Sequence, residues 1–351
     1  GTHQMWKMAD ERALPRALVV NKMDRENVDF QRVLESIQEN FGRGCVAVQI
    51  PIGAEADFSG SINLLSEQQD VPADLQEQVD TARQQLTEAI AETDDDLATK
   101  YLEGHILSHE EMTTGLKAGV ASGAIVPVMV SSATTNVGAA EVLDVIVDLL
   151  PSPTETSSIK ATRPDSGEEI NLSSKPDEPI AALVFKTTAD PFVGKLSYLR
   201  VYSGVFESNS QSWNATKTEA ERVGQVFTIM GKAQEPISHL VPGDIGAVAK
   251  LSSVVTGDTL SAKEDPLILE GLEFPSPVYN MAVSPKSKAD LDKMTTVAAR
   301  IVEEDPSLTI TREPNTLEML LGGLGDTHVE VSVGKMKRKF GVEIRLETPK
   351  V

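Results

Sequence analysis

The sequence predicts three domains of different fold class: α/β first, all-β next and α+β last. Up to about residue 157, short apolar runs rich in β-branched residues alternate with stretches of helical spacing. From residue 178, short strands recur between Gly and Pro turn residues, and from residue 272 the order is β-α-β-β-α-β. A chain of 351 residues, 40% of them hydrophobic, is long enough to bury several separate cores.

The first domain, predicted over residues 1–157, reads as a parallel sheet covered by helices, because strands and helices alternate along it. Its strands are expected at residues 16–20, 46–52, 61–65 and 125–133, and its helices at residues 1–13, 30–41, across 74–119 and at 138–150.

Residues 158–177 are rich in Ser, Thr, Pro and charge without periodicity, which predicts a linker or an ordered surface connection. Residues 178–270 carry Gly and Pro at the spacing of an all-β barrel. Residues 272–351 follow the split βαβ order, with the stretch 328–340 beginning as a strand and running into a helix.

Composition narrows the class of protein. No apolar run approaches the roughly 18 residues of a membrane span, and residues 1–15 contain no signal-peptide core. The single cysteine, Cys45, excludes an internal disulfide and suits a reducing cytoplasm. The net charge is −21, and residues 55–111 hold 15 acids against 2 bases, whereas residues 272–351 hold 12 against 11. The acidic stretch is either a solvated surface or a docking face for a basic protein.

Asn21-Lys22-Met23-Asp24 follows the buried strand at residues 16–20. Ligands of α/β domains bind at the carboxyl ends of strands. A carboxylate at Asp24 can accept hydrogen bonds from N1–H and the exocyclic amine of guanine, whereas adenine would oppose it with an unpaired acceptor. Lys22 would lie along the base plane and Asn21 would tie neighbouring loops together. A polar strand-end turn of this composition can also arise by chance.

Ser131-Ser132-Ala133 ends the next strongly apolar strand. A Ser-Ala turn there would present backbone N–H groups to guanine O6. The pair Ser132 and Ala133 is a weak signal alone, and its position after Asn21–Asp24 is what makes it specific for a guanine site.

Other polar stretches give no catalytic or metal residue. The sequence holds no phosphate cradle of the form G-x-x-x-x-G-K-[ST]. Gly243–Gly246 only superficially resembles Asp-x-x-Gly, because one residue separates Asp244 from Gly246, and it should be a turn of the barrel. Gly322–Gly325 is expected in a hairpin between two strands. His328 and Glu330 are expected on a strand face without a third metal ligand.

A basic segment near the end of the chain is the best candidate for contact with RNA phosphates, although a solvated helix face explains it slightly better. Its residues are Lys335, Lys337, Arg338 and Lys339.

Nine stretches, in chain order, together resemble elongation factor G. They are ALVVNKMDRENVDF, PIGAEADFSGSINLL, YLEG, DLLPSP, ADPFVGKLSYLRVYSG, PGDIGAVAKL, TGDTL, EDP and GGLGDTHVEV. The resemblance implies a multidomain fold: part of a Ras-like G domain over residues 1–157 with the G′ insert at about 44–120, a Greek-key β-barrel domain II at 178–270, and a ferredoxin-like domain III at 272–351.

The resemblance implies that the parent protein is a GTPase that binds GTP or GDP with Mg²⁺ and acts on the ribosome in translocation. Its implied partners are small-subunit RNA and proteins for domains II and III, and the ribosomal stalk protein for the acidic G′ region. The guanine-binding residues carry over to Asn21, Lys22, Asp24, Ser132 and Ala133. The phosphate loop, the switch regions and their catalytic histidine are expected before Gly1, so these 351 residues should lack GTPase activity and bind no nucleotide tightly.

Two departures from the family pattern leave alternatives open: the insert is short between Leu65 and Val71, and residues 157–175 are atypical. The alternatives are a recycling or ribosomal-protection paralogue, or a natural non-catalytic ribosome-binding module. The strand at residues 16–20 is also expected to be an unpaired apolar edge, which predicts self-association through it or local disorder.

Overall fold

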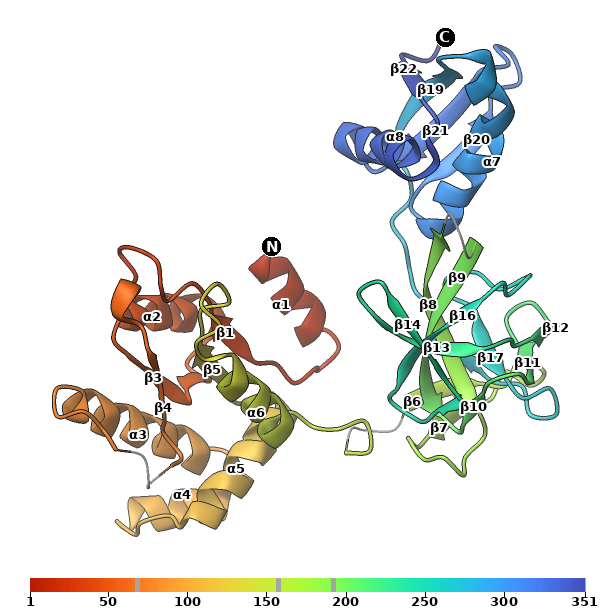
Figure 1. Cartoon of the computed structure of the whole chain (residues 1–351). Coiled ribbons are helices and arrows are strands. Elements are labelled where there is room, and N and C mark those ends of the chain that lie inside the picture. The colour runs from red at the N-terminus through yellow and green to blue at the C-terminus, as the bar shows by residue number, and fades with distance from the viewer. Residues whose placement is uncertain (67–69, 156–158, 191–193, 351) are drawn as a thin grey trace. The chain divides into compact units, whose positions relative to one another are not determined.

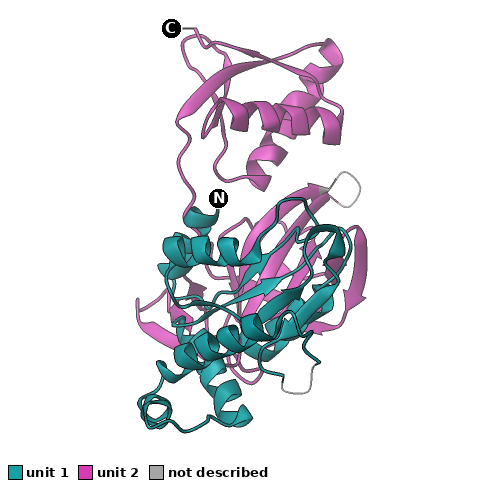
Figure 2. Ribbon diagram, turned by 90° about the vertical axis from the view of Figure 1, so that its left-hand side faces the viewer, with its two compact units in different colours: residues 1–152 teal, residues 153–351 magenta. Residues whose placement is uncertain are grey.

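The computed structural model describes residues 1–66, 70–155, 159–190 and 194–350. Parts of the short insert segment 65–71 and of the stretch ADPFVG therefore lie outside the described residues. The chain divides into two compact units, Gly1–Ser152 and Pro153–Val351, shown in different colours in Figure 2. No helix within the described ranges is long and apolar enough to cross a membrane.

Unit 1 is built on a parallel three-stranded sheet of order β1-β5-β2 (Figure 1). Its strands are β1 (Leu18–Val20), β5 (Val126–Val130) and β2 (Cys45–Ala47). Every residue of β5 is buried, as expected of a central strand covered on both faces. The predicted parallel α/β arrangement is confirmed, and β2 shows that the segment predicted as the insert also contributes to the central sheet.

Helices pack around this sheet and its insert, and three of them begin with side-chain caps. Asp29 accepts from the Arg32 N–H, Asp94 accepts from the Asp96 and Leu97 N–H groups, and Ser108 forms a capping box with Glu111. The helices are α1 (Thr2–Asp10), α2 (Phe30–Phe41), α3 (Gln76–Ala91), α4 (Asp95–Leu102), α5 (His109–Ser122) and α6 (Ala139–Leu149). An antiparallel hairpin, β3 (Gln49–Ile52) and β4 (Gly60–Asn63), encloses the 3₁₀ turn η1 (Glu55–Asp57).

Unit 2 opens with the predicted β domain, an antiparallel sheet of eight strands in the order β12-β11-β17-β8-β9-β16-β13-β14. These strands are β8 (Ala181–Asp190), β9 (Gly194–Ser203), β11 (Gln211–Asn214), β12 (Glu219–Arg222), β13 (Val226–Met230), β14 (Ala233–Ile237), β16 (Ile245–Ala249) and β17 (Thr259–Ser261). A short pair, β10 (Phe206–Glu207) and β15 (His239–Leu240), covers the core beside Leu199 and Val226.

The segment predicted as a linker or an ordered surface connection contains two short strands. Strands β6 (Ile159–Thr162) and β7 (Glu169–Leu172) form a hairpin, and β18 (Ile268–Leu269) pairs with β6. Buried Ala161 and Leu172 pack with Leu267. Because β6 and β7 are only four residues long, their alternation of apolar and polar residues was too brief to stand out among the Ser, Thr and Pro around them.

The last domain follows the predicted β-α-β-β-α-β order and forms a sheet of order β20-β21-β19-β22 with two helices (Figure 1). Its elements are β19 (Tyr279–Pro285), α7 (Lys288–Glu304), β20 (Thr309–Arg312), β21 (Met319–Gly323), α8 (Asp326–Phe340) and β22 (Ile344–Glu347).

Two expectations about this domain were wrong. His328 and Glu330 lie in α8, not on a strand, and Gly322–Gly325 joins strand β21 to α8, not two strands. The sequence from His328 to Val333 alternates as a strand would, but the buried residues Val329, Ser332 and Met336 follow helical spacing. The segment is therefore helical, because only a helix buries these three residues on one face.

Candidate guanine-binding site

The two loops expected to bind guanine meet because they leave the carboxyl ends of neighbouring parallel strands. Val20 of β1 pairs with Val130 of β5. The Ser131 N–H donates to the Val20 carbonyl at 3.0 Å, and the Met23 N–H donates to the Ser131 carbonyl at 3.3 Å. The ladder thus continues past the strands and holds the two loops side by side.

Asp24 and Ser132 are in direct contact. The Ser132 hydroxyl donates to Asp24 Oδ1 at 2.6 Å, and Ser132 is completely buried while Asp24 is half-buried. This hydrogen bond is the main cause that lowers the pKa of Asp24 below its ordinary value. Asp24 is therefore held ionised and oriented, as an acceptor for two N–H donors must be.

Asn21 bridges the same two loops. Its Oδ1 accepts from the Lys22 N–H at 2.7 Å and from the Ala133 N–H at 3.0 Å. The Ala133 amide, expected to face guanine O6, donates instead to Asn21. Sequence reasoning could not foresee this competition, because the two residues are far apart in the chain.

Lys22 has left-handed backbone geometry, with φ of 68°, and is exposed. A non-glycine residue rarely adopts this region, and such strain concentrates at functional loops. The turn directs the following residue inward. Met23 is fully buried and anchors the loop between Lys22, which is exposed, and Asp24, which is half-buried.

A third segment that the sequence did not assign to the site also holds this loop. The Glu55 N–H donates to the Met23 carbonyl at 3.0 Å, and Glu55 Oε1 accepts from the Asn27 N–H at 2.7 Å. Glu55 lies in η1, inside the stretch PIGAEADFSG. That stretch contributed to the family resemblance but carried no chemical signal of its own.

A groove of about 970 Å³ runs beside the site between α1, β1 and α2. Asn21 and Lys22 line it, but Asp24 and Ser132 do not. Its floor is the outer edge of β1, where Val19 is 44% exposed. Residues 16–20 are ordered, so the expectation of local disorder was wrong. Self-association through this edge stays a prediction.

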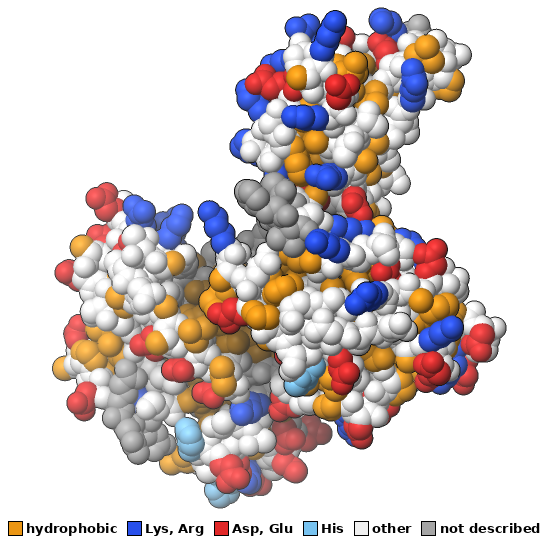
Figure 3. Space-filling view, turned by 45° about the vertical axis from the view of Figure 1, so that its right-hand side comes forward, with side chains coloured by type: hydrophobic (Ala, Val, Ile, Leu, Met, Phe, Trp, Pro, Cys, Tyr) orange, Lys and Arg blue, Asp and Glu red, His pale blue; other side chains and the backbone are white. Residues whose placement is uncertain are grey.

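The basic segment of α8 is largely paired within the chain. Lys335 and Lys339 each lie 2.5 Å from the carboxylate of Glu304 on α7, and Lys337 lies 3.0 Å from Glu343. On the face drawn in Figure 3, blue side chains are spread among red ones and do not form one patch. These ion pairs weaken the expected RNA contact at three of its four residues.

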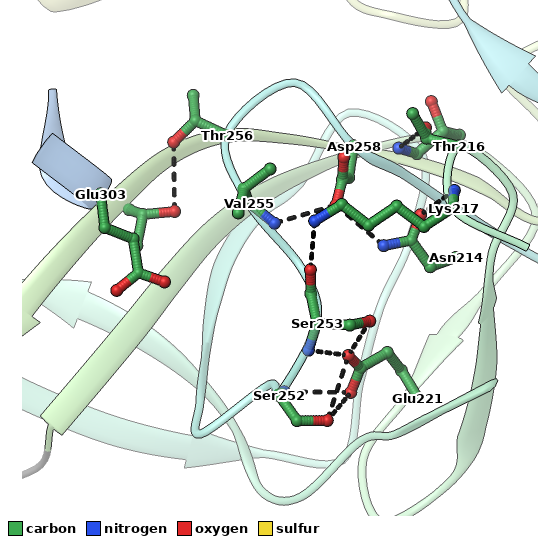
Figure 4. A network of polar contacts seen from close by, with 12 residues as sticks. Asn214, Thr216, Lys217, Glu221, Ser252, Ser253, Val255, Thr256, Asp258 and Glu303 are labelled. Carbon is green, nitrogen blue, oxygen red and sulfur yellow. Dashed lines mark hydrogen bonds and ion pairs between the residues drawn. The ribbon is translucent and has the colours of Figure 1, made fainter. Parts of the chain in front are cut away.

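The barrel contains a polar network that is structural (Figure 4). Buried Glu221 accepts hydrogen bonds from Ser252 and Ser253, and buried Asp258 accepts from Asn214 at 2.8 Å. These bonds fix the loop before β17. The expected turn lies at Pro242–Gly243, where Asp244 accepts from the Val241 N–H at 3.0 Å, and Gly246 already belongs to β16. Among the described residues, no group of three or more His, Cys, Asp or Glu could hold a metal.

The chain thus combines a parallel α/β sheet with two polar loops at its strand ends, a β-barrel and a split βαβ domain. Models of three domain families match in order: the elongation factor Tu GTP binding domain over residues 1–152, elongation factor G domain 2 over 179–263, and elongation factor G domain III over 274–348. The chain therefore carries, one after another, the domains of elongation-factor-G-like translation factors.

A crystal structure of a protein from Thermus thermophilus has the same architecture, with a TM-score of 0.82 at 28% sequence identity. The match covers 100% of the present chain and 52% of that protein. The chain thus spans about half the length of this relative.

Proposed function

We propose that the protein acts in translation elongation as a guanine-nucleotide-dependent factor of the elongation factor G type, promoting translocation on the ribosome in the cytoplasm. The observation that carries the guanine part is the ionised Asp24 carboxylate, oriented by Ser132 at the junction of two strand-end loops. The match of residues 1–152 to a GTP-binding domain supports it.

Base recognition follows from donor and acceptor chemistry. The carboxylate of Asp24 accepts from guanine N1–H and the exocyclic amine, Lys22 covers one face of the base, and Asn21 keeps the loops at a fixed separation. Adenine offers an acceptor at N1 and no amine at C2, so binding it would leave acceptors unpaired. We assign no residue of this chain to the phosphates, to Mg²⁺ or to hydrolysis.

The ribosomal partners are the second part of the proposal. The acidic helices between Asp74 and Glu111 would meet a basic stalk protein through long-range attraction that salt weakens. Glu88 is a poor probe of this contact because it accepts a hydrogen bond from the Tyr101 hydroxyl at 2.9 Å. Exposed Glu92 and Asp95 are better. Reversing both charges should weaken stalk binding, and binding unchanged by reversal and by salt would contradict the contact.

The guanine site is tested by nuclear magnetic resonance titration of the chain with GDP, ADP and XDP. GDP should shift the amide signals of Asp24 and Ser132 at millimolar concentration, and ADP should not. An Asp24→Asn variant should prefer XDP to GDP, because its amide can donate to the C2 carbonyl of xanthine. Equal responses to GDP and ADP, or a variant that keeps its GDP preference, would refute the assignment.

A further inference from the structure

We propose that Glu55 is a positioning residue for the guanine-binding loop, an inference that rests on the proposed function of that loop. The η1 turn lies between β3 and β4, outside the two loops expected to contact the base. Glu55 makes two hydrogen bonds to residues 21–28. Its N–H donates to the Met23 carbonyl, and its carboxylate accepts from the Asn27 N–H.

These two bonds enclose the base-reading residue. Met23 and Asn27 lie on either side of Asp24, and the Arg25 N–H closes a turn onto the Lys22 carbonyl at 3.0 Å. Across the loop, the Met23 N–H donates to Ser131. The peptide groups of Met23 are therefore held from two directions, by β5 through Ser131 and by the η1 turn through Glu55.

Unusual backbone geometry is concentrated at this junction. Lys22, Asn27 and Glu55 all have positive φ, at 68°, 61° and 54°. Such conformations persist where surrounding contacts over-determine them. The turn also requires glycine at position 53: φ is +74°, and an added Cβ would lie 2.2 Å from the Asp57 carbonyl oxygen. Gly53 therefore permits the tight turn from which the Glu55 carboxylate accepts the Asn27 N–H.

The role is local because Glu55 is exposed and contributes no apolar burial. Removing its carboxylate frees the Asn27 amide and lets residues 24–27 sample more conformations. Apparent affinity then falls with the fraction of molecules whose Asp24 is correctly placed. A residue that only stabilised the fold would instead lower the melting temperature without changing exchange at Asn27 selectively.

The test compares Glu55→Ala, which removes the acceptor, with Glu55→Gln, which keeps one, and with Asp57→Ala, a control on an exposed side chain in the same turn. Three quantities are measured on the full chain: amide hydrogen exchange at Asn27, GDP affinity by titration, and melting temperature. Glu55→Ala should speed Asn27 exchange and weaken GDP binding by about three- to tenfold at a nearly unchanged melting temperature. Glu55→Gln should recover most of the affinity, and Asp57→Ala should match the unmodified chain.

Unchanged Asn27 exchange and GDP affinity in Glu55→Ala would overturn the inference while leaving guanine recognition by Asp24 intact. If the unmodified chain instead fails to distinguish GDP from ADP, the proposed function fails. Asn27 exchange and the Asp24 carboxyl chemical shift would then still decide whether Glu55 orders the loop: altered values in Glu55→Ala alone would support ordering, and unaltered values would refute it.

Discussion

Asp24 in unit 1 and Glu304 in unit 2 are two carboxylates with opposite uses. Asp24 is half-buried and takes its hydrogen bond from a neutral hydroxyl. The Glu304 side chain is 2% exposed, lies between two lysines of α8, and accepts from the Ala189 N–H of β8 at 2.5 Å. Burial raises the pKa of Glu304, but the lysines and this N–H outweigh it and lower the pKa overall.

The comparison separates a carboxylate that stays available to a ligand from one whose charge is fully paired within the fold. Glu304 joins the β-barrel to the α+β domain, and its neighbour Glu303 does the same by pairing with Lys195 of β9. Asp305 lies 3.0 Å from His328 of α8, a contact within the α+β domain. The network satisfies the charges within the chain. At Asp24, a neutral partner orients the carboxylate without neutralising it.

The largest expected effect is the loss of Glu304. Glu304→Ala leaves two lysines and the Ala189 amide without their shared acceptor, and breaking a buried pair in this way costs about 3 kcal/mol. Urea unfolding of the chain measures the change. Glu330→Ala, on the exposed face of α8, is the matched control and should be nearly neutral. Equal midpoints for the two variants would show that Glu304 does not hold the domains together.

A pH effect of intermediate size follows from the same group. Because the pKa of Glu304 is lowered in the folded chain, its contribution to stability is present above the ordinary Glu value of about 4.3. That contribution is lost as pH falls through the lower folded-state value. Urea midpoints measured from pH 6 downward should fall less steeply in Glu304→Gln. Parallel curves would contradict the pairing.

Ser132→Ala should affect stability less and recognition more. The variant removes the hydroxyl that lowers the pKa of Asp24, so this pKa should rise toward its ordinary value. Carbon-detected titration of the Asp24 carboxyl measures the shift. The free energy of unfolding should fall by only about 1 kcal/mol. If the Asp24 carboxyl titrates as in the unmodified chain, the Ser132 hydroxyl does not control the pKa of Asp24.

The smallest effect is expected at the edge of unit 1. The Val20 carbonyl faces β5, so the peptide groups of Val19 face the open side of β1. Val19→Pro removes one outward donor and should reduce self-association, measured by sedimentation at high concentration. A chain that is monomeric without the substitution would show that this edge does not pair.

The sequence by itself determined the three fold classes and placed Asn21–Asp24 and Ser132 at the ends of two strands. Those features are local, since apolar periodicity and strand-end polar residues are visible within a few neighbours. Tertiary structure decided that the segment at His328 is a helix, because its sequence fits both strand and helix periods and packing against the sheet favours the helix. It also decided that the expected linker forms part of a small sheet.

Tertiary structure also decided which groups Asn21, Glu55 and Glu304 contact. Each contacts a backbone or side-chain group distant in sequence, and hydrogen bonds between distant residues leave no periodic trace in the chain. The sequence therefore identified the residues proposed here to bind guanine, and only the fold showed which contacts hold them in place.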